Sequence, residues 1–156
     1  MKRGTIALLS LLSVLSAFPV SALDLRGQVI GIVDGDTLDM LELETRHIYR
    51  IRLNGINTPE RGEPYYQKAK DSLASLAFGQ SVLVDTMGQD GHGRTVGVIH
   101  VGNENVNLAQ VQRGFAMVCK NYSRDKNLWE AEDQAVSWEI NIWAPPGPRR
   151  PAWCKD

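Results

Sequence analysis

The chain has 156 residues, of which 43% are hydrophobic and 22% charged, and this is the balance of one ordinary globular domain. Such a composition excludes a chain that is disordered along most of its length. The formal net charge of −1 excludes a protein that grips nucleic acid mainly through a strongly basic surface, so any phosphate must be bound by a few local side chains.

The N-terminus has the pattern of a secretory signal peptide. Lys2 and Arg3 precede an apolar run from Ile6 to Val20, and small residues close it. We expect cleavage after Ala22, which removes a signal peptide at 1–22, and export of a soluble protein to the periplasm or the medium. The mature chain then carries 15 Lys and Arg against 18 Asp and Glu, a formal charge of −3. The alternative is a retained membrane anchor, but the run falls short of the roughly 18 apolar residues that a spanning helix requires.

Three strands are predicted between Leu25 and Ile56, because β-branched runs are separated there by turn residues at Asp34-Gly35 and Glu44-Thr45. In the third strand, the alternation of side chains separates two sets: Tyr49, Ile51 and Leu53 on one face, and Ile48, Arg50 and Arg52 on the other. A barrel that buries the first set would turn both arginines outward, where they could face a ligand.

A helix and two further strands follow. Apolar residues recur at helical spacing at Tyr66, Ala69, Leu73 and Leu76, and Gly79 has the place of a C-cap. The two strands are expected at 81–87 and 95–101, separated by a glycine-rich turn at 88–94. A short helix is predicted from about Asn107 to Arg113, before Gly114.

The last predicted helix has the clearest apolar stripe, formed by Leu128, Ala131, Ala135, Trp138 and Ile142. We expect this helix to end at Pro145-Pro146 and to bury Trp138 and Trp143 in the core. The segment 145–156 is too rich in proline for a packed element and is expected to be a tail. The folded domain would then span 23–144.

The order of elements favours an α+β fold, a five-stranded OB-type barrel flanked by three helices. Two cysteines, Cys119 and Cys154, fall in the mature chain, and thiols of an exported protein tend to pair. A bridge between them would pin the tail to the domain and stabilise it by about 3 to 4 kcal/mol in the chain-entropy picture. Two free thiols are the alternative.

Four short segments carry residues that could take part in metal binding or catalysis: Asp34 to Thr37, Arg52, Asn57 to Glu60, and Gly93-Arg94. Each alone is explained by turn geometry or by helix capping. Together they offer oxygen atoms for a hard cation, two guanidinium groups for a phosphodiester, and one glutamate that could activate water.

In its motifs the chain resembles the staphylococcal nuclease (thermonuclease) family. The resemblance rests on D-G-D-T at 34–37, R-L-x-G-I-x-T-P-E at 52–60, D-x-x-G-R at 90–94, R-G-F-A at 113–116 and I-W at 142–143. It covers essentially the whole mature chain. Several ordered motifs at family-like spacing are far more specific than any one of them.

This resemblance implies roles for six residues. One calcium ion would be held by the side chains of Asp36 and Asn57 and by the backbone carbonyl of Thr58. Glu60 would be the general base, and Arg52 and Arg94 would contact the scissile phosphate. The resemblance therefore implies three catalytic residues from separate segments: Arg52, Glu60 and Arg94.

The chain departs from the family pattern at two places. Asn57 replaces the commoner aspartate, which removes a formal charge from the metal site and leaves magnesium or manganese open as alternatives to calcium. In the nucleotide pocket, Lys120 and Tyr122 occupy the positions of two tyrosines. Tyr122 could stack on a base, while Lys120 would supply a charge in place of a ring.

One further residue, His92, allows two interpretations. His92, in the turn beside Arg94, is either an exposed turn residue or an acid that protonates the leaving oxygen. None of the three histidines has the spacing of metal ligands. The sequence offers no role for Trp129 or Trp153.

The leading hypothesis is an exported, monomeric, calcium-dependent endonuclease that hydrolyses phosphodiester bonds in DNA and RNA. The alternative is a catalytically silent OB-type module that binds nucleic acid or a protein. Because the chain keeps the carboxylates and arginines that silent relatives tend to lose, namely Asp36, Arg52, Glu60 and Arg94, the sequence favours the enzyme.

Overall fold

The computed structural model describes residues 24–154. The predicted signal peptide at 1–22 lies outside the described residues, and so do the last two residues of the predicted tail. In chain order, the elements are β1 (Asp24–Asp34), β2 (Thr37–Glu42), β3 (Ile48–Leu53), β4 (Ile56–Asn57), α1 (Tyr66–Ala77), β5 (Ser81–Gln89), β6 (Thr95–Val101), β7 (Glu104–Asn105), α2 (Val106–Gln112), β8 (Met117–Val118), α3 (Lys126–Ser137) and the single 3-10 turn η1 (Asn141–Trp143). No helix within these residues combines the length and the apolar character that crossing a membrane requires.

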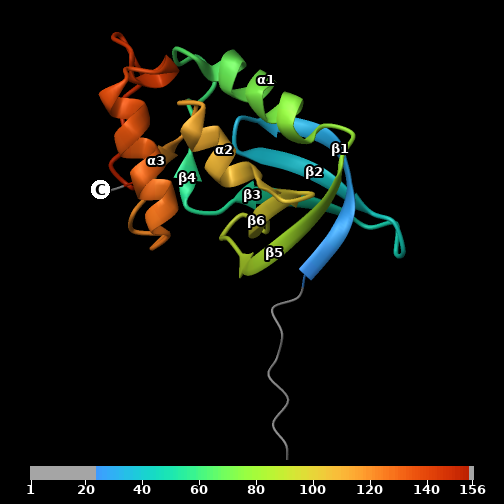
Figure 1. Ribbon diagram of the computed structural model, residues 1–156. Coiled ribbons are helices and arrows are strands. Elements are labelled where there is room, and N and C mark those ends of the chain that lie inside the picture. Colours follow the sequence, from blue (N-terminus) through green and yellow to red (C-terminus); the bar gives the residue numbers. More distant parts are fainter. Residues whose placement is uncertain (1–23, 155–156) are drawn as a thin grey trace, which may run out of the picture.

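Strands β1, β2, β3, β5 and β6 form a closed barrel. β1 pairs antiparallel with β2 and with β5, β2 with β3, and β5 with β6. The barrel closes where β3 runs parallel to β6. With α1, α2 and α3 in the described part of the chain, this arrangement confirms the predicted OB-type barrel with three helices (Figure 1).

The barrel interior is filled by the alternating apolar residues of its strands. On β3, Ile51 and Leu53 are buried, while Arg52 lies on the opposite face, as the alternation predicts. The other apolar barrel residues with less than 2% exposure are Val29, Leu38, Met40, Val84 and Ile99. Burying this face of β3 is what turns Arg52 away from the core.

The helices pack on the barrel and on one another. α1 lies against β1 and buries Ala69, Leu73 and Leu76, and Gly79 follows it in the left-handed conformation, with φ of 74°. α2 contacts both α1 and α3 (Figure 1). The Asn105 side chain caps α2 by accepting a hydrogen bond from the Leu108 N–H at 3.0 Å.

The prediction of one long final helix was wrong. α3 ends at Ser137, because Glu139 adopts a left-handed conformation with φ of 51° and the Ile140 N–H returns to the Ala135 carbonyl at 3.0 Å. Trp138 is therefore 66% exposed rather than in the core, while Ile142 is buried from the separate turn η1.

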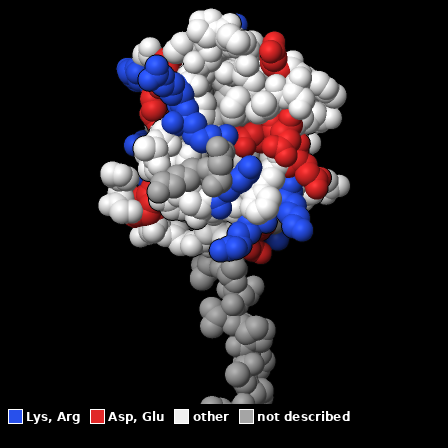
Figure 2. All heavy atoms as spheres, turned by 90° about the vertical axis from the view of Figure 1, so that its left-hand side faces the viewer, with Lys and Arg blue, Asp and Glu red and all other residues white. Residues whose placement is uncertain are grey.

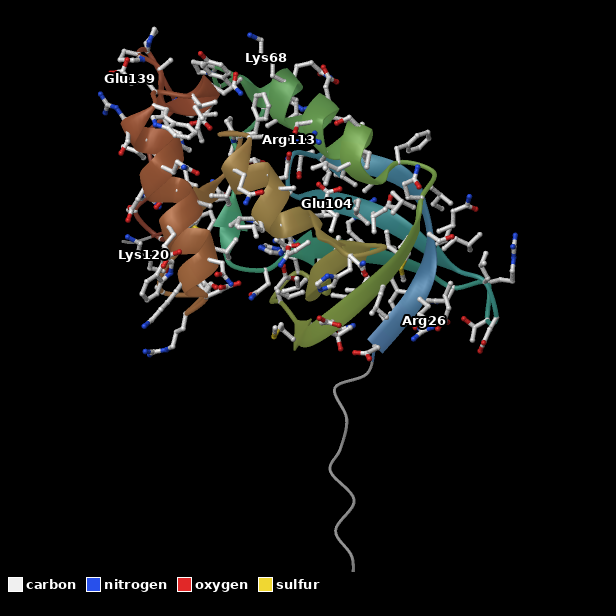
Figure 3. All side chains as sticks on the ribbon, in the orientation of Figure 1. Arg26, Lys68, Glu104, Arg113, Lys120 and Glu139 are labelled. Carbon is white, nitrogen blue, oxygen red and sulfur yellow. A yellow bond between two sulfur atoms is a disulfide. The ribbon has the colours of Figure 1, made fainter. Side chains whose placement is uncertain are left out.

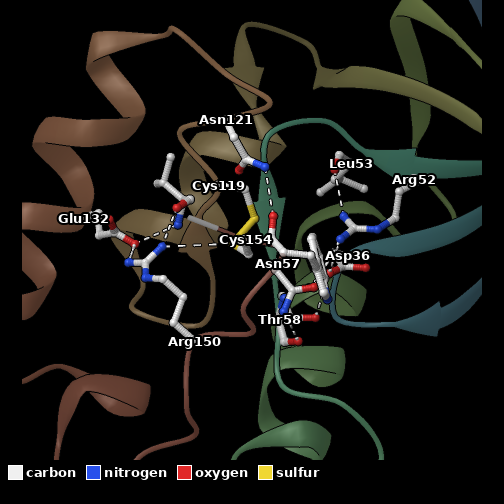
Figure 4. The surroundings of a disulfide bond; sticks show 12 residues. Asp36, Arg52, Leu53, Asn57, Thr58, Cys119, Asn121, Glu132, Arg150 and Cys154 are labelled. Carbon is white, nitrogen blue, oxygen red and sulfur yellow. Dashed lines mark hydrogen bonds and ion pairs between the residues drawn. A yellow bond between two sulfur atoms is a disulfide. The ribbon is translucent and has the colours of Figure 1, made fainter. Parts of the chain in front are cut away.

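A disulfide and the side chain of Arg150 fix the described part of the tail to the domain. Cys119 and Cys154 form a disulfide. Arg150 donates to the Val118 carbonyl and pairs with the buried Glu132 of α3 at 2.7 Å (Figure 4). Although it contains no helix or strand, the tail therefore follows a defined path along the surface.

Candidate active site

The turn at 34–37 is closely packed against the segment that follows β4. Asp34 stabilises the turn by accepting a hydrogen bond from the Asp36 N–H at 3.2 Å. A Cβ added to Gly35 would lie 2.7 Å from Oγ1 of Thr58 and 2.8 Å from Cβ of Ala69. Only glycine therefore allows the turn to approach Thr58 this closely.

The carboxylate of Asp36 connects three segments of the chain. Its Oδ2 accepts hydrogen bonds from the backbone N–H of Thr58 at 2.9 Å and from the Thr58 hydroxyl at 3.2 Å. The same oxygen lies 3.1 Å from Nη2 of Arg52, and Oδ1 accepts from the Thr37 hydroxyl at 3.1 Å. Asp36 thus joins the turn between β1 and β2 to β3 and to the 57–60 segment (Figure 4).

Burial raises the pKa of Asp36 to about 6, from an ordinary value of 3.8. The positive charge of Arg52 opposes this shift, whereas the nearby Asp34 adds to it. Asp36 is 5% exposed, so its negative charge has little contact with water. A bound cation would favour the charged form of this carboxyl.

Asn57 and Thr58 bring further oxygen atoms to this cluster. Both residues are 3% exposed. Nη2 of Arg52 donates to Oδ1 of Asn57 at 3.3 Å, and Nδ2 of Asn57 donates to the Thr58 carbonyl at 3.2 Å. Asp36, the Asn57 amide and the Thr58 carbonyl therefore offer the oxygen-only donor set that a hard cation such as calcium prefers.

The donor set has one carboxylate. In residues 24–154, no group of three or more His, Cys, Asp or Glu is arranged to hold a metal ion. The predicted set falls outside such a group, because two of its three members are an amide and a backbone carbonyl. As placed, the Asn57 amide turns its nitrogen toward the Thr58 carbonyl, so its oxygen would reach the same side only after the amide rotates.

Glu60 lies in the exposed loop that leads to α1. Its N–H donates to Oε2 of Glu63 at 2.6 Å, and the Glu63 N–H returns to the Glu60 carbonyl at 2.9 Å. Because α1 begins only at Tyr66, the 58–60 segment is not the first turn of a helix. The side chain of Glu60 is exposed and can meet water directly.

Arg94 is oriented by Asp90 within the turn between β5 and β6. Oδ2 of Asp90 lies 2.7 Å from Nε of Arg94, and Oδ1 accepts from the N–H groups of His92 at 2.9 Å and of Arg94 at 3.0 Å. Desolvation acts to raise the pKa of Asp90, but the hydrogen bonds from Arg94 and His92 together hold it below its usual range. Gly93, with φ of 77°, supplies the left-handed residue of this turn.

One pocket of about 520 Å³ unites the two arginines, which lie far apart in the sequence. Arg52 lines it from β3 and Arg94 from the turn before β6. Its other polar and aromatic lining residues are Asp90, His92, Tyr122 and Trp153, and Asn54 completes the polar part. On the face shown in Figure 2, Lys and Arg side chains gather beside a group of Asp and Glu side chains.

The predicted site residues therefore divide into two groups around Arg52. Arg52, Arg94 and Tyr122 line the pocket. The oxygen cluster of Asp36, Asn57 and Thr58 is joined to Arg52 through the bonds of its guanidinium to Asp36 and Asn57. Glu60 lies on the loop that follows Thr58. Lys120 does not line the pocket: its ammonium group lies 5.9 Å from the centroid of the Trp129 ring of α3 (Figure 3). Arg50 is also turned elsewhere, because its guanidinium is paired with Asp39 at 2.9 Å.

Gln110 supports the site but has no distinctive sequence signal. This fully buried residue of α2 donates through Nε2 to the carbonyls of Gly35 at 2.7 Å and Ala69 at 3.1 Å, and its Oε1 accepts from the Ser72 hydroxyl at 2.6 Å. Gln110 thereby holds the 34–37 turn against α1 and α2. A single polar residue in a short helix gives no sign of this role.

Comparisons with known proteins identify the family of the chain. The family model described as staphylococcal nuclease homologue matches residues 50–145. A protein named micrococcal nuclease from Shigella flexneri is 34% identical over 139 residues, which cover 82% of this chain and 79% of that protein. A protein named uncharacterized endonuclease from Haemophilus influenzae is 34% identical over 125 residues, 80% of this chain and 70% of its own length. Protein ParB from Escherichia coli is 32% identical over 160 residues, 94% of this chain and 89% of that protein. The chain therefore belongs to the staphylococcal nuclease family.

Proposed function

We propose that this protein is a calcium-dependent endonuclease that hydrolyses phosphodiester bonds of DNA and RNA by attack of water. The observation that carries the proposal is the meeting of Arg52 and Arg94 in one pocket, with Arg52 bonded directly to the oxygen cluster around Asp36. Family membership and the names of the relatives, nuclease and endonuclease, support the same reaction.

The two arginines would bind the scissile phosphate and stabilise the negative charge that develops on it. Asp36 and Asn57 hold Nη2 of Arg52, while the Leu53 carbonyl accepts from Nη1 at 2.8 Å. Asp90 engages Arg94 through Nε, so this carboxylate leaves both terminal nitrogens for the phosphate. Guanidinium groups that are already oriented need no reorganisation during the reaction, and each such donor is typically worth ~10² to 10³ in rate.

The oxygen cluster would hold the cation. Asp36 supplies a carboxylate, Asn57 an amide oxygen and Thr58 a backbone carbonyl, and waters would complete a calcium coordination sphere. When bound, the ion would polarise a phosphoryl oxygen as a Lewis acid. Because Asn57 is uncharged, we propose weaker calcium binding than a site with two carboxylates would give.

Glu60 would orient and deprotonate the attacking water. Its place on an exposed loop, two residues after Thr58, supports this role. A positioned general base contributes about 10² to 10⁴ in rate.

We further propose that the mature protein acts as a monomer outside the cytoplasm. The signal-peptide pattern at 1–22 supports export, and the disulfide between Cys119 and Cys154 suits an oxidising compartment.

The test is cleavage of plasmid DNA and of RNA by the mature protein, in calcium and in a calcium chelator, alongside Glu60→Gln. The matched control is Glu104→Gln, which changes an exposed glutamate of β7. We expect cleavage only in calcium, a large loss for Glu60→Gln, and the wild-type rate for Glu104→Gln. Equal cleavage in the chelator would contradict the calcium site, and no cleavage with any divalent ion would favour a silent binding module.

A further inference from the structure

Trp153 belongs to the tail but lines the same pocket as Arg52 and Arg94. It lies beside Tyr122, with the two ring centroids 6.4 Å apart and the ring planes at 65°. Both rings are open to solvent, with Tyr122 62% and Trp153 48% exposed. Two exposed aromatic side chains therefore line the pocket in which, under the proposed function, the phosphate binds.

The backbone around Trp153 is fixed from both sides. The next residue, Cys154, is buried and bridged to Cys119. Nδ2 of Asn121 donates to the Trp153 carbonyl at 2.8 Å, so the segment just after Cys119 also holds the tail directly (Figure 4). These bonds fix the main chain while the indole ring stays exposed.

A second anchor lies three residues earlier. Arg150 pairs with Glu132, which is 3% exposed, and the same carboxylate oxygen accepts from the Val118 N–H at 2.7 Å. The Arg150 guanidinium also lies 5.8 Å from the centroid of the Trp143 ring. Breaking a buried ion pair of this kind is strongly unfavourable, so the path of the tail from Arg150 to Cys154 is well determined.

Arginines beside exposed aromatic rings are the combination that binds single-stranded nucleic acid. The guanidinium groups take the backbone phosphate, and the rings stack on bases, each of which has an aromatic face. In a duplex these faces are covered by neighbouring base pairs. Rings at the rim of a phosphate pocket can therefore reach only an unpaired base.

We propose that Trp153, held in place by the disulfide-anchored tail, stacks on an unpaired base next to the phosphate bound by Arg52 and Arg94. The tail thereby contributes a base-binding side chain to the substrate site. This inference rests on the proposed function, because it takes the phosphate pocket as the place where nucleic acid binds.

The test measures binding separately from cleavage. A fluorescein-labelled oligothymidylate is titrated in a calcium chelator, and fluorescence anisotropy reports Kd for the wild type, Trp153→Ala and Trp153→Phe. The matched control is Trp138→Ala, which removes an exposed tryptophan of the domain that does not line the pocket. Thermal unfolding of each variant verifies that it is folded.

We expect Trp153→Ala to raise Kd for the single strand by roughly 5- to 150-fold, the factor that corresponds to about 1 to 3 kcal/mol of stacking per base. Trp153→Phe should retain most of the affinity, and Trp138→Ala all of it. A duplex of the same length should bind the wild type and Trp153→Ala equally well. Equal single-strand affinity of Trp153→Ala and the wild type would overturn the inference, as would a wild type that does not bind the single strand.

The role of the anchor is tested by Cys119→Ala/Cys154→Ala, which keeps Trp153 but removes the disulfide. We expect this double variant to lose single-strand affinity, and we expect Trp153→Ala to cost much less in the double variant than in the wild type. If Trp153→Ala raised Kd by the same factor in the double variant as in the wild type, Trp153 would act without the disulfide. Since no step of this assay requires hydrolysis, an absence of cleavage overturns the proposed endonuclease, whereas an absence of Trp153-dependent binding overturns this inference.

Discussion

Asp36 organises the candidate site at the scale of single residues. Its buried carboxylate binds Arg52, Thr37 and Thr58, and therefore places the proposed cation ligands next to an arginine that is proposed to bind phosphate. Burial of the negative charge of Asp36 is unfavourable, and the positive charge of Arg52 offsets this only in part. The pKa of Asp36 is therefore raised. Under the proposed function, a bound cation would offset this cost by favouring the charged form of Asp36.

The raised pKa makes a prediction about stability and pH. Because the folded-state pKa of Asp36 is about 6 and the unfolded value about 3.8, the folded state takes up a proton first as the pH falls through 6. The wild type should therefore gain stability relative to Asp36→Asn between pH 7 and pH 4, by up to roughly 3 kcal/mol at about 1.4 kcal/mol per pH unit. Urea unfolding of both proteins in a chelator at several pH values measures the difference. A pH-independent difference would contradict the raised pKa.

Asn57 makes a prediction about the cation. Asn57→Asp should lower the calcium concentration for half-maximal cleavage by tenfold or more, since a unit charge about 4 Å from another contributes about 4 kcal/mol at an effective dielectric of 20. Without calcium, the added charge beside Asp36 should destabilise the protein. Calcium titration of the cleavage rate, together with unfolding in a chelator, tests both parts. An unchanged calcium requirement would remove Asn57 from the proposed ligand set.

The elements explain how dispersed residues come together. Parallel pairing of β3 with β6 brings Arg52 close to the turn that carries Arg94, and α2 supports the 34–37 turn through Gln110. Alternation along β3 was sufficient to predict the direction of Arg52, because burial of one face decides the other. The end of α3 was not predictable from its stripe, because the left-handed conformation of Glu139 is set by the tertiary path to the buried Ile142.

Gln110 joins α2 to the 34–37 turn, and replacing it tests whether this contact supports the site. Gln110→Met keeps the length of the side chain but leaves the Gly35 carbonyl and the Ser72 hydroxyl without this partner. We expect a loss of about 1 to 3 kcal/mol in the free energy of unfolding and slower cleavage at saturating calcium. Gln112→Met, an exposed substitution on the same helix, is the control. Equal effects of the two substitutions would show that Gln110 does not support the turn.

The molecule as a whole joins a barrel domain, a pocket lined by two arginines, and a tail that is covalently fixed by a disulfide. The cysteine count alone suggested a bridge from Cys119 to Cys154, since only one pairing exists within the chain. The position of Trp153 could not be predicted, because it follows from the path of the tail around α3 and not from a local pattern. Motifs therefore identified the arginines, whereas only the fold brought Trp153 beside them.

The disulfide makes a prediction for the stability of the whole domain. It joins residues 35 positions apart and encloses α3, so its removal should lower the free energy of unfolding by about 3 to 4 kcal/mol. Urea unfolding of Cys119→Ala/Cys154→Ala measures the loss. A reducing agent should lower the stability of the wild type to that of the variant and leave the variant unchanged. A wild type that is insensitive to reduction would contradict this account of the tail.

We propose that Arg52 and Arg94 hold the phosphate that is cleaved, and a comparison of cleavage rates tests this claim. Plasmid cleavage in calcium is measured for Arg94→Gln and for Arg50→Gln, which removes an arginine of β3 that is bound to Asp39 outside the pocket. We predict that Arg94→Gln slows cleavage by about 10² to 10³ and that Arg50→Gln cleaves at the wild-type rate. Cleavage by Arg94→Gln at the rate of Arg50→Gln would contradict the claim.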